Sequence, residues 1–232
     1  MSPRAIVKEA KGRGVELIAV TDHNSCGNLV YVERVAREEG IVLIPGMELQ
    51  TEEEVHLLAY FQTLDEALAF GEEIYAYLPD VKNDPDFFGD QVVVDEEENI
   101  VRVEEKLLVN SLLLSIDQCV EMIDNYGGIS VPAHVDRETY GIISQLGFVP
   151  DYLGFKAVEI SRAVTPQEAL ERWPELEKYT LVSSSDAHYL EDIGRVVTSF
   201  LMDEPSWKEL VTALETGGER VCVSRSLEDE GE

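Results

Sequence analysis

Short apolar runs alternate with amphipathic helical stretches along most of this 232-residue sequence. The apolar runs have the length of buried strands, and the stretches between them repeat their apolar residues at helical spacing. This alternation predicts an α/β fold with a largely parallel sheet or barrel. The expected strands cover 15–22, 41–50, 55–61, 128–134, 157–161, 180–188 and 196–202, and the expected helices cover 2–14, 27–40, 64–78, 166–179 and 206–218.

Length and composition predict a single domain over residues 1–232, with an insertion at 80–110. A chain of this size with 44% hydrophobic residues can bury an ordinary core. The insertion interrupts the alternation, because a Pro-, Asn- and Asp-rich approach leads into QVVVDEEENIVRV. That pattern indicates a hairpin around an acidic turn, and we expect the segment to cover one rim of the fold.

Acidic residues dominate the charge. The sequence has 47 Asp and Glu against 18 Lys and Arg, a net charge of −29, and its acidic runs are interpreted as solvated faces. Such a surface repels phosphate backbones, which excludes long nucleic acid as an expected partner. A small phosphorylated substrate can still bind where metal ions reverse the local field. The oligomeric state is left open.

Three features predict a cytoplasmic location and no membrane partner. No apolar run approaches the length of a membrane span. The opening residues MSPRAIVKEAKGRG lack the core of a signal peptide. The three cysteines lie far apart and are odd in number, which favours free thiols in a reducing compartment.

The chain has only four histidines, and all of them lie beside the end of an apolar strand. His23 follows ELIAV, His134 follows ISVPA and His188 follows LVSSSDA. In parallel α/β folds the carboxyl ends of the strands carry the functional loops, which converge on one face. His56 begins its strand instead, but a tight hairpin before it would bring it to the same rim as Glu48.

These imidazoles, with carboxylates at neighbouring positions, suggest a metal site. The carboxylates are Glu48, Asp186 and Asp22. Mixed imidazole and carboxylate ligands suit Zn, Mn or Fe at sites that keep a water bound, and such ions polarise phosphate and generate hydroxide. A single strand-end histidine is more often a hydrogen-bonded packing residue, but four of four in this position favour ligands.

The sequence resembles the PHP (polymerase and histidinol phosphatase) superfamily of metal-dependent phosphoesterases. The resemblance rests on TDHN at 21–24, GMEL at 46–49 with His56 downstream, PAHVDR at 132–137 and SSDAH at 184–188, in the family's order. It implies a distorted (β/α)7-type PHP barrel with up to three metal ions at the carboxyl-terminal rim.

The resemblance implies a metal role for each matching histidine and carboxylate. Glu48 would bridge the first two metals, and Asp186 would hold the first. His56 and His134 would complete the second site, while the two remaining histidines would hold the third. The metals would be Mn, Zn or Fe.

The resemblance also suggests residues for catalysis and substrate binding. Asp22 would orient an imidazole or position water, and His23 or His188 would assist proton transfer. Arg137 and Arg162 would grip phosphate through bidentate hydrogen bonds, the alternative being surface ion pairs with neighbouring acids.

One element of the family has no counterpart in this sequence. The family opens with a strand bearing a His-x-His pair and, soon after, an Asp, whereas MSPRAIV already corresponds to the first helix. We therefore expect the barrel to lack its first strand, through truncation or as a naturally shortened version. Only the second site keeps a full set of ligands, Glu48, His56 and His134, so we expect at most one tightly bound metal ion.

The leading hypothesis is a phosphoesterase that hydrolyses small phosphate monoesters or short oligonucleotides with metal-activated hydroxide, impaired in this chain. The main alternative is a non-catalytic PHP-fold module, for binding or structure, with a degraded metal site. A metal-dependent amidohydrolase ranks last. It would normally use a ligating lysine on a strand, whereas Lys156 precedes the strand AVEIS.

Overall fold

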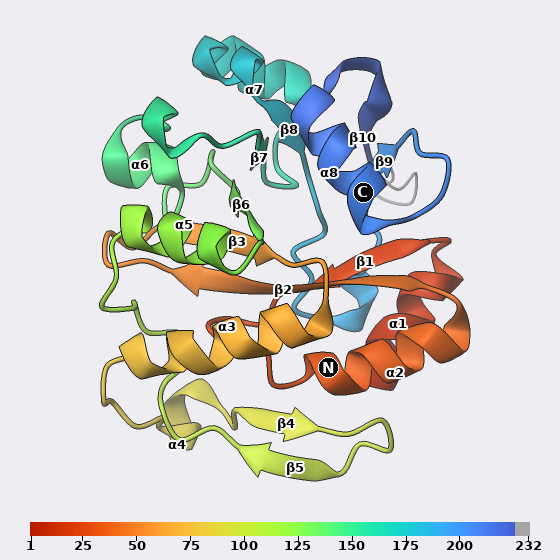
Figure 1. The fold of residues 1–232 in the computed structure, drawn as a ribbon, viewed down its shortest axis with the longest axis vertical. Coiled ribbons are helices and arrows are strands. Elements are labelled where there is room, and N and C mark those ends of the chain that lie inside the picture. Colours follow the sequence, from red (N-terminus) through yellow and green to blue (C-terminus); the bar gives the residue numbers. More distant parts are fainter. Residues whose placement is uncertain (226–232) are drawn as a thin grey trace.

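A four-stranded sheet in the order β1–β2–β3–β6 lies at the centre of the molecule (Figure 1). This computed structural model describes residues 1–225. The sheet consists of β1 (Leu17–Val20), β2 (Val42–Gln50), β3 (His56–Tyr60) and β6 (Ile129–Pro132). β1 and β2 are parallel, whereas β3 is antiparallel to both β2 and β6.

Three two-stranded sheets complete the β structure. They are β4–β5 (Val92–Val94 and Ile100–Val103, antiparallel), β7–β8 (Ala157–Glu159 and Thr180–Val182, parallel) and β9–β10 (Val196–Phe200 and Val221–Arg225, antiparallel). The α/β class is confirmed, but no sheet closes into a barrel within residues 1–225. The expectation of largely parallel pairing is wrong, because β3 is antiparallel to both of its neighbours, β2 and the sequence-distant β6.

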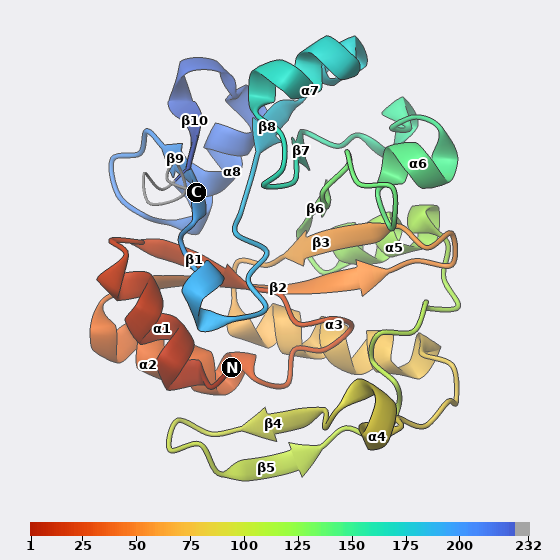
Figure 2. The same cartoon turned by 180° about the vertical axis from the view of Figure 1, so that it is seen from behind.

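Helices cover both faces of the central sheet. The α-helices of the described residues are α1 (Pro3–Gly12), α2 (Leu29–Glu39), α3 (Leu64–Tyr77), α4 (Pro85–Phe88), α5 (Ile116–Asn125), α6 (Ile142–Leu146), α7 (Pro166–Arg172) and α8 (Trp207–Thr216). Helices α1, α2 and α3 lie on one side of the sheet and α8 on the other (Figures 1 and 2). No helix among the described residues has the length and apolarity needed to cross a membrane.

Local sequence signals account for most helix starts. Ser2 caps α1 with Pro3 just inside it, and Thr63, Ser115 and Thr165 begin α3, α5 and α7 with reciprocal capping boxes. The single helix expected at 166–179 is divided. Pro174 has no N–H to donate, so α7 ends before it and a 3₁₀ helix continues over Pro174–Lys178.

The segment at 80–110 forms the hairpin expected of it. β4 and β5 lie beyond α3, on the far side of that helix from the central sheet (Figures 1 and 2). The chain then returns past the loop after β1, where Nδ2 of Asn24 donates to the carbonyls of Leu108 (2.8 Å) and Asn110 (3.0 Å). That this segment is an insertion into a single domain of residues 1–232 remains a prediction.

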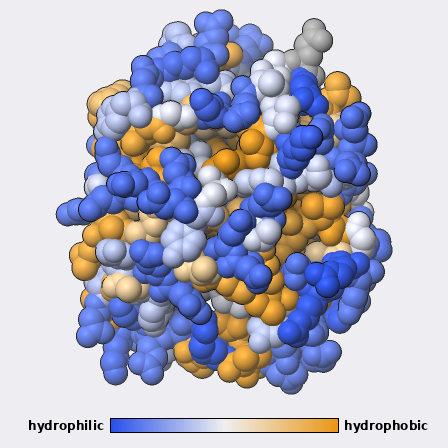
Figure 3. Space-filling view, in the orientation of Figure 1, coloured by the Kyte–Doolittle hydropathy of each residue, from blue (hydrophilic) through white to orange (hydrophobic). Residues whose placement is uncertain are grey.

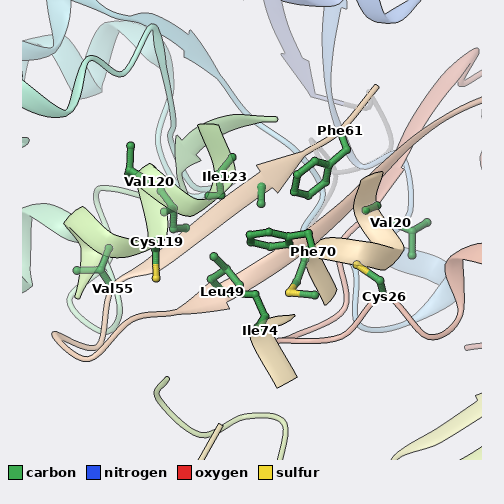
Figure 4. Close-up of a cluster of buried hydrophobic side chains, with 14 of the residues drawn as sticks. Val20, Cys26, Leu49, Val55, Phe61, Phe70, Ile74, Cys119, Val120 and Ile123 are labelled. Atoms are coloured by element: carbon green, nitrogen blue, oxygen red, sulfur yellow. The ribbon is translucent and has the colours of Figure 1, made fainter. Parts of the chain in front are cut away.

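The larger apolar core lies between the central sheet and helices α1, α2, α3 and α5. Figure 4 shows its aromatic centre, where the rings of Phe61 and Phe70 lie 4.8 Å apart and both side chains are fully buried. Ile74 of α3 and Ile123 of α5 are also fully buried in this cluster. A smaller cluster on the opposite face packs α8 against the sheet.

This core predicts an effect on stability. Phe70→Ala should lower the free energy of unfolding by about 3–5 kcal/mol, because a large side chain is removed from a close-packed site. Phe148→Ala is the matched control, since Phe148 is 55% exposed, and should change stability by no more than about 0.5 kcal/mol. Urea denaturation followed by circular dichroism measures both. Equal losses in the two variants would contradict the assignment of the core.

Candidate metal centre

The structure brings all four histidines together in one row. His23 follows β1, His56 begins β3, His134 follows β6 and His188 follows β8. The ring centroids of His134 and His56 are 5.2 Å apart, those of His56 and His23 are 5.0 Å apart, and those of His23 and His188 are 6.5 Å apart. Side chains that are distant in the sequence therefore meet at the strand ends.

Glu48 lies beside this row because its backbone is held on both edges of β2. Its N–H donates to the carbonyl of Asp22 (3.3 Å), and its carbonyl accepts the N–H of Asn24 (3.0 Å). On the other edge β2 pairs with β3 in a register that places Gln50 opposite His56. The tight turn between these strands therefore returns His56 to the Glu48 side chain.

Three donor atoms form the compact centre of the cluster. Oε1 of Glu48 is 2.9 Å from Nδ1 of His56 and 3.3 Å from Nε2 of His134, and these two nitrogens are 3.2 Å apart. Neighbouring ligands of one tetrahedral zinc ion lie about 3.3 Å apart when each is bound at about 2.0–2.1 Å. The spacing of the three atoms matches that requirement.

His23 extends the donor set on the other oxygen of the carboxylate. Oε2 of Glu48 is 3.8 Å from Nδ1 of His23, and the candidate ligand atoms of His23, Glu48 and His56 all lie within 4.8 Å of one another. That Nδ1 is buried and has no hydrogen-bond partner among residues 1–225. Buried polar atoms are normally satisfied, so an unpartnered imidazole nitrogen beside a carboxylate fits a divalent metal ion.

The electrostatics keep this donor set ready to bind a cation. Burial raises the pKa of Glu48, but hydrogen bonds from His134 and His56 and the charge of His23 outweigh it, and the net pKa lies below its ordinary value. Burial lowers the pKa of His23, more strongly than Glu48 raises it. The two shifts favour the forms that bind a metal ion, which are the ionised carboxylate of Glu48 and the neutral imidazole of His23.

Two of the predicted ligands have backbones in the left-handed region. The φ angle is 28° at His134 and 44° at Asp186. Residues other than glycine rarely adopt this region, which costs about 1–3 kcal/mol and persists where the surroundings enforce it. At His134 the enforcing contact is a hydrogen bond from its backbone N–H to Oε2 of Glu159 (3.2 Å). Such strain is found preferentially at functional sites.

Asp186 and His188 lie at the open end of the row. Oδ1 of Asp186 is 3.8 Å from Nδ1 of His188, whose side chain is 65% exposed, compared with 3% for His134. Oδ2 of Asp186 accepts a hydrogen bond from Nη2 of Arg137 at 2.6 Å. The six predicted ligands are contiguous, but the compact set surrounds Glu48. The metal-binding role of all six stays a prediction.

The remaining predicted site residues form ordinary polar contacts. Oδ2 of Asp22 accepts a hydrogen bond from Asn28 (2.9 Å). Arg162 donates to Oδ1 of Asp192 (3.1 Å), so both Arg162 and Arg137 form the ion pairs that were the alternative to phosphate binding. Lys156 is exposed just before β7.

Sequence reasoning missed two residues that surround His56. The ring of Tyr140 stacks on His56 with centroids 4.3 Å apart and planes 4° apart, and the Tyr140 carbonyl accepts the His56 N–H. Oε1 of Gln50 lies 3.3 Å from Nε2 of His56. The signal for Gln50 was its place two residues after Glu48, on the same face of the strand. Tyr140 lies in a loop that offered no such pattern.

Glu159 is a third missed residue, and it links the ends of three strands. Its carboxylate accepts hydrogen bonds from the His134 backbone and the Ser184 hydroxyl, and its carbonyl accepts the N–H of Val135. Burial raises its pKa to about 7, against the opposing effect of the Ser184 hydrogen bond. The available signal was a charged residue inside the apolar run AVEIS.

Comparisons of the sequence identify two similarities. Residues 171–218 match the protein family described as PHP-associated. The uncharacterized protein MJ1587 of Methanocaldococcus jannaschii is 39% identical over 51 residues, which are 22% of this chain and 30% of that protein.

Solved structures with low sequence identity share the fold. The lesion-specific endonuclease Q of Pyrococcus furiosus has a TM-score of 0.68 at 19% identity, over 96% of this chain and 53% of its own. Endonuclease Q in complex with a 27-mer duplex with an abasic lesion at the active site has a TM-score of 0.68 at 18% identity, over 95% and 53%. A two-domain Bacteroides vulgatus protein containing a predicted PHP-like metal-dependent phosphoesterase has a TM-score of 0.52 at 16% identity, over 96% and 60%. The chain thus spans about half of endonuclease Q.

The buried carboxyl of Glu159 predicts a pH-dependent stability. Its folded-state pKa of about 7 lies above the ordinary 4.5, so between these values the folded protein binds more protons than the unfolded one. Stability should therefore fall as pH rises through that window, and Glu159→Gln should remove this contribution. The melting temperature of the variant relative to the wild type should be higher at pH 7.5 than at pH 4.5.

Thermal melts in chelator at both pH values measure this difference. Glu97→Gln, at an exposed carboxylate, is the control for the loss of one acid. A difference between Glu159→Gln and wild type that is the same at both pH values would rule out a raised pKa.

Proposed function

We propose, from the PHP superfamily membership that the family match and the shared fold support, that this chain is a metal-dependent phosphoesterase. The observation that carries the proposal is the set of Glu48, His56 and His134 donor atoms 2.9–3.3 Å apart. A divalent ion bound there would polarise a phosphate ester and lower the pKa of a water molecule. Mn, Zn and Fe are the ions that this mixed donor set suits.

The chain's own residues would supply proton transfer and phosphate binding. Burial lowers the pKa of His23 and so favours its neutral form, and its Nδ1, when not bound to a metal ion, would accept a proton from an attacking water. His188 is exposed at the end of the row, where it can exchange that proton with solvent. Arg137 would bind phosphate after exchanging its hydrogen bond with Asp186 for one with the substrate.

The acidic surface favours small phosphate monoesters as substrates over polymers. A net charge of −29 repels a long phosphodiester, whereas a monoester brings few charges to the site. Short oligonucleotides are the second substrate class, supported by the fold shared with endonuclease Q, which binds a duplex with an abasic lesion.

A non-catalytic binding module is the second candidate, and the Arg137–Asp186 ion pair favours it. Asp186 is the residue expected to hold the first metal, yet its Oδ2 is bound to a guanidinium at 2.6 Å. If that ion pair persists when phosphate is present, Asp186 is not available to the first metal ion and Arg137 is not available to phosphate. The chain would then bind a single metal ion without turnover.

The donor set predicts a metal content. Desalted wild-type protein loaded with Zn²⁺ should retain about one ion per chain, because the closely spaced donor atoms among residues 1–225 all share Glu48. His134→Ala should lose it, whereas His188→Ala should retain it, since His188 lies outside that set. Elemental analysis measures all three proteins. Retention of zinc by His134→Ala, or its loss from His188→Ala alone, would contradict the assignment.

The phosphoesterase proposal predicts hydrolysis that depends on the bound ion. The Mn²⁺-loaded chain should release phosphate from p-nitrophenyl phosphate, and chelator should abolish this. His134→Ala should lower kcat by a factor on the order of a hundred or more while the circular dichroism spectrum is unchanged. Metal binding without turnover of the monoester or of a short oligonucleotide would support the binding module instead.

A further inference from the structure

Exposed apolar side chains are concentrated in the 80–110 segment. Of fifteen large apolar side chains that are exposed in the described part of the chain, seven lie there. Ile100, Val101 and Val103 of β5 are 65%, 52% and 54% exposed, and Phe87, in the neighbouring α4, is 79% exposed. Figure 3 shows apolar atoms at the foot of the molecule, over the hairpin. Apolar surface gathered in this way marks an interaction site more often than scattered single residues do.

β5 is also an edge strand with open hydrogen-bonding groups. It pairs with β4 and with no other strand among residues 1–225, and all four of its residues are exposed. Natural edge strands are usually protected by an outward lysine, a proline or a covering loop. The only charge on β5 is Arg102, and its guanidinium is held by Glu104. The pairing shifts register between Val93 and Val94, which leaves Val101 as a bulge, so the edge is only partly protected.

The position of the β4–β5 hairpin is fixed before any partner strand binds, because its acidic turn is attached to the rest of the protein. Arg34 of α2 forms an ion pair with Glu96 (3.1 Å), and Nε of Arg4 donates to the Glu96 carbonyl (3.2 Å). On the β4 edge, the N–H of Val94 donates to Oδ1 of Asn28 (3.0 Å). β4 thus faces the protein, which leaves β5 as the outer strand.

The excess of acidic residues around β5 indicates what kind of partner strand could pair with it. Residues 80–106 contain ten acids and three bases. Two of the bases are engaged, Arg102 with Glu104 and Lys106 with the backbone carbonyls of Tyr75 and Leu78. A partner strand must therefore bring positive charge as well as apolar side chains.

A second copy of this chain is a poor occupant. Pairing of two β5 strands would bring together two copies of a segment, residues 80–106, that contains ten acids and three bases, and like charges close together destabilise a sheet. Both copies also carry a net charge of −29.

We propose that β5 is a docking edge for an extended, basic segment of another protein, in which aliphatic residues alternate with lysine or arginine. The segment adds to the hairpin as a third strand. Its main-chain hydrogen bonds satisfy the open edge, its aliphatic side chains cover Val101 and Val103, and its cations face the surrounding acids. This surface is separate from the metal centre, so its occupancy is independent of the proposed phosphoesterase activity.

Labelled peptides test the proposal directly. The probe is a peptide of about eight residues in which lysine and valine alternate, a length that spans one strand. The same residues in the order Lys-Lys-Val-Val, repeated, form the control peptide, with identical charge but no alternating face. Fluorescence anisotropy should show tighter binding of the alternating peptide, and amide chemical shifts should change along Ile100–Val103.

A pair of variants separates the edge from general charge attraction. Val101→Lys/Val103→Lys should weaken binding of the alternating peptide about tenfold or more, because apolar contact is lost and like charge is added. Leu113→Lys/Leu201→Lys changes the charge equally at exposed apolar positions elsewhere and should retain wild-type affinity. Thermal melts confirm that both variants fold.

Three outcomes would overturn the proposal. The first is equal binding of the two peptides, and the second is equal weakening of binding by the two double variants. The third is a dimer of the chain alone in sedimentation equilibrium that is absent in Val101→Lys/Val103→Lys. The last result would assign the edge to a second copy.

Discussion

The carboxylate of Glu48 determines where the histidines can lie. A buried carboxylate is costly unless charged or hydrogen-bonding groups surround it, and here His56 and His134 donate to one oxygen while His23 faces the other. Backbone hydrogen bonds on both edges of β2 fix the position of Glu48. The strands on either side therefore present their imidazoles to one point, and the chemistry follows from that convergence.

The sequence could predict this convergence because strand ends are visible as the points where apolar runs stop. His23 and His134 are at such points, and the reversal before His56 is signalled by an acidic turn between two apolar runs. Pairing direction was beyond reach, because β3 and β6 are antiparallel neighbours separated by a long excursion that carries no register information. Glu159 was missed since a single acid in a short apolar run has no repeat to reveal its burial.

The acidic runs show a different limit of sequence reasoning. The sequence suggested solvated faces, yet Glu53 accepts the N–H of Ile116 at the start of α5, and Glu96 attaches the hairpin to α2. These partners lie more than sixty positions away, so no local pattern could have identified them. Composition alone gives the excess of charge but not which charges support the fold.

The backbone at His134 has a consequence for how this protein can change over generations. A φ of 28° suits glycine better than histidine, so a replacement by glycine would relieve conformational strain while it removes the imidazole. Sequence change that is limited only by the need to fold would therefore tend to replace this histidine. At this one position, ease of folding and the chemistry of the cluster make opposing demands on the side chain.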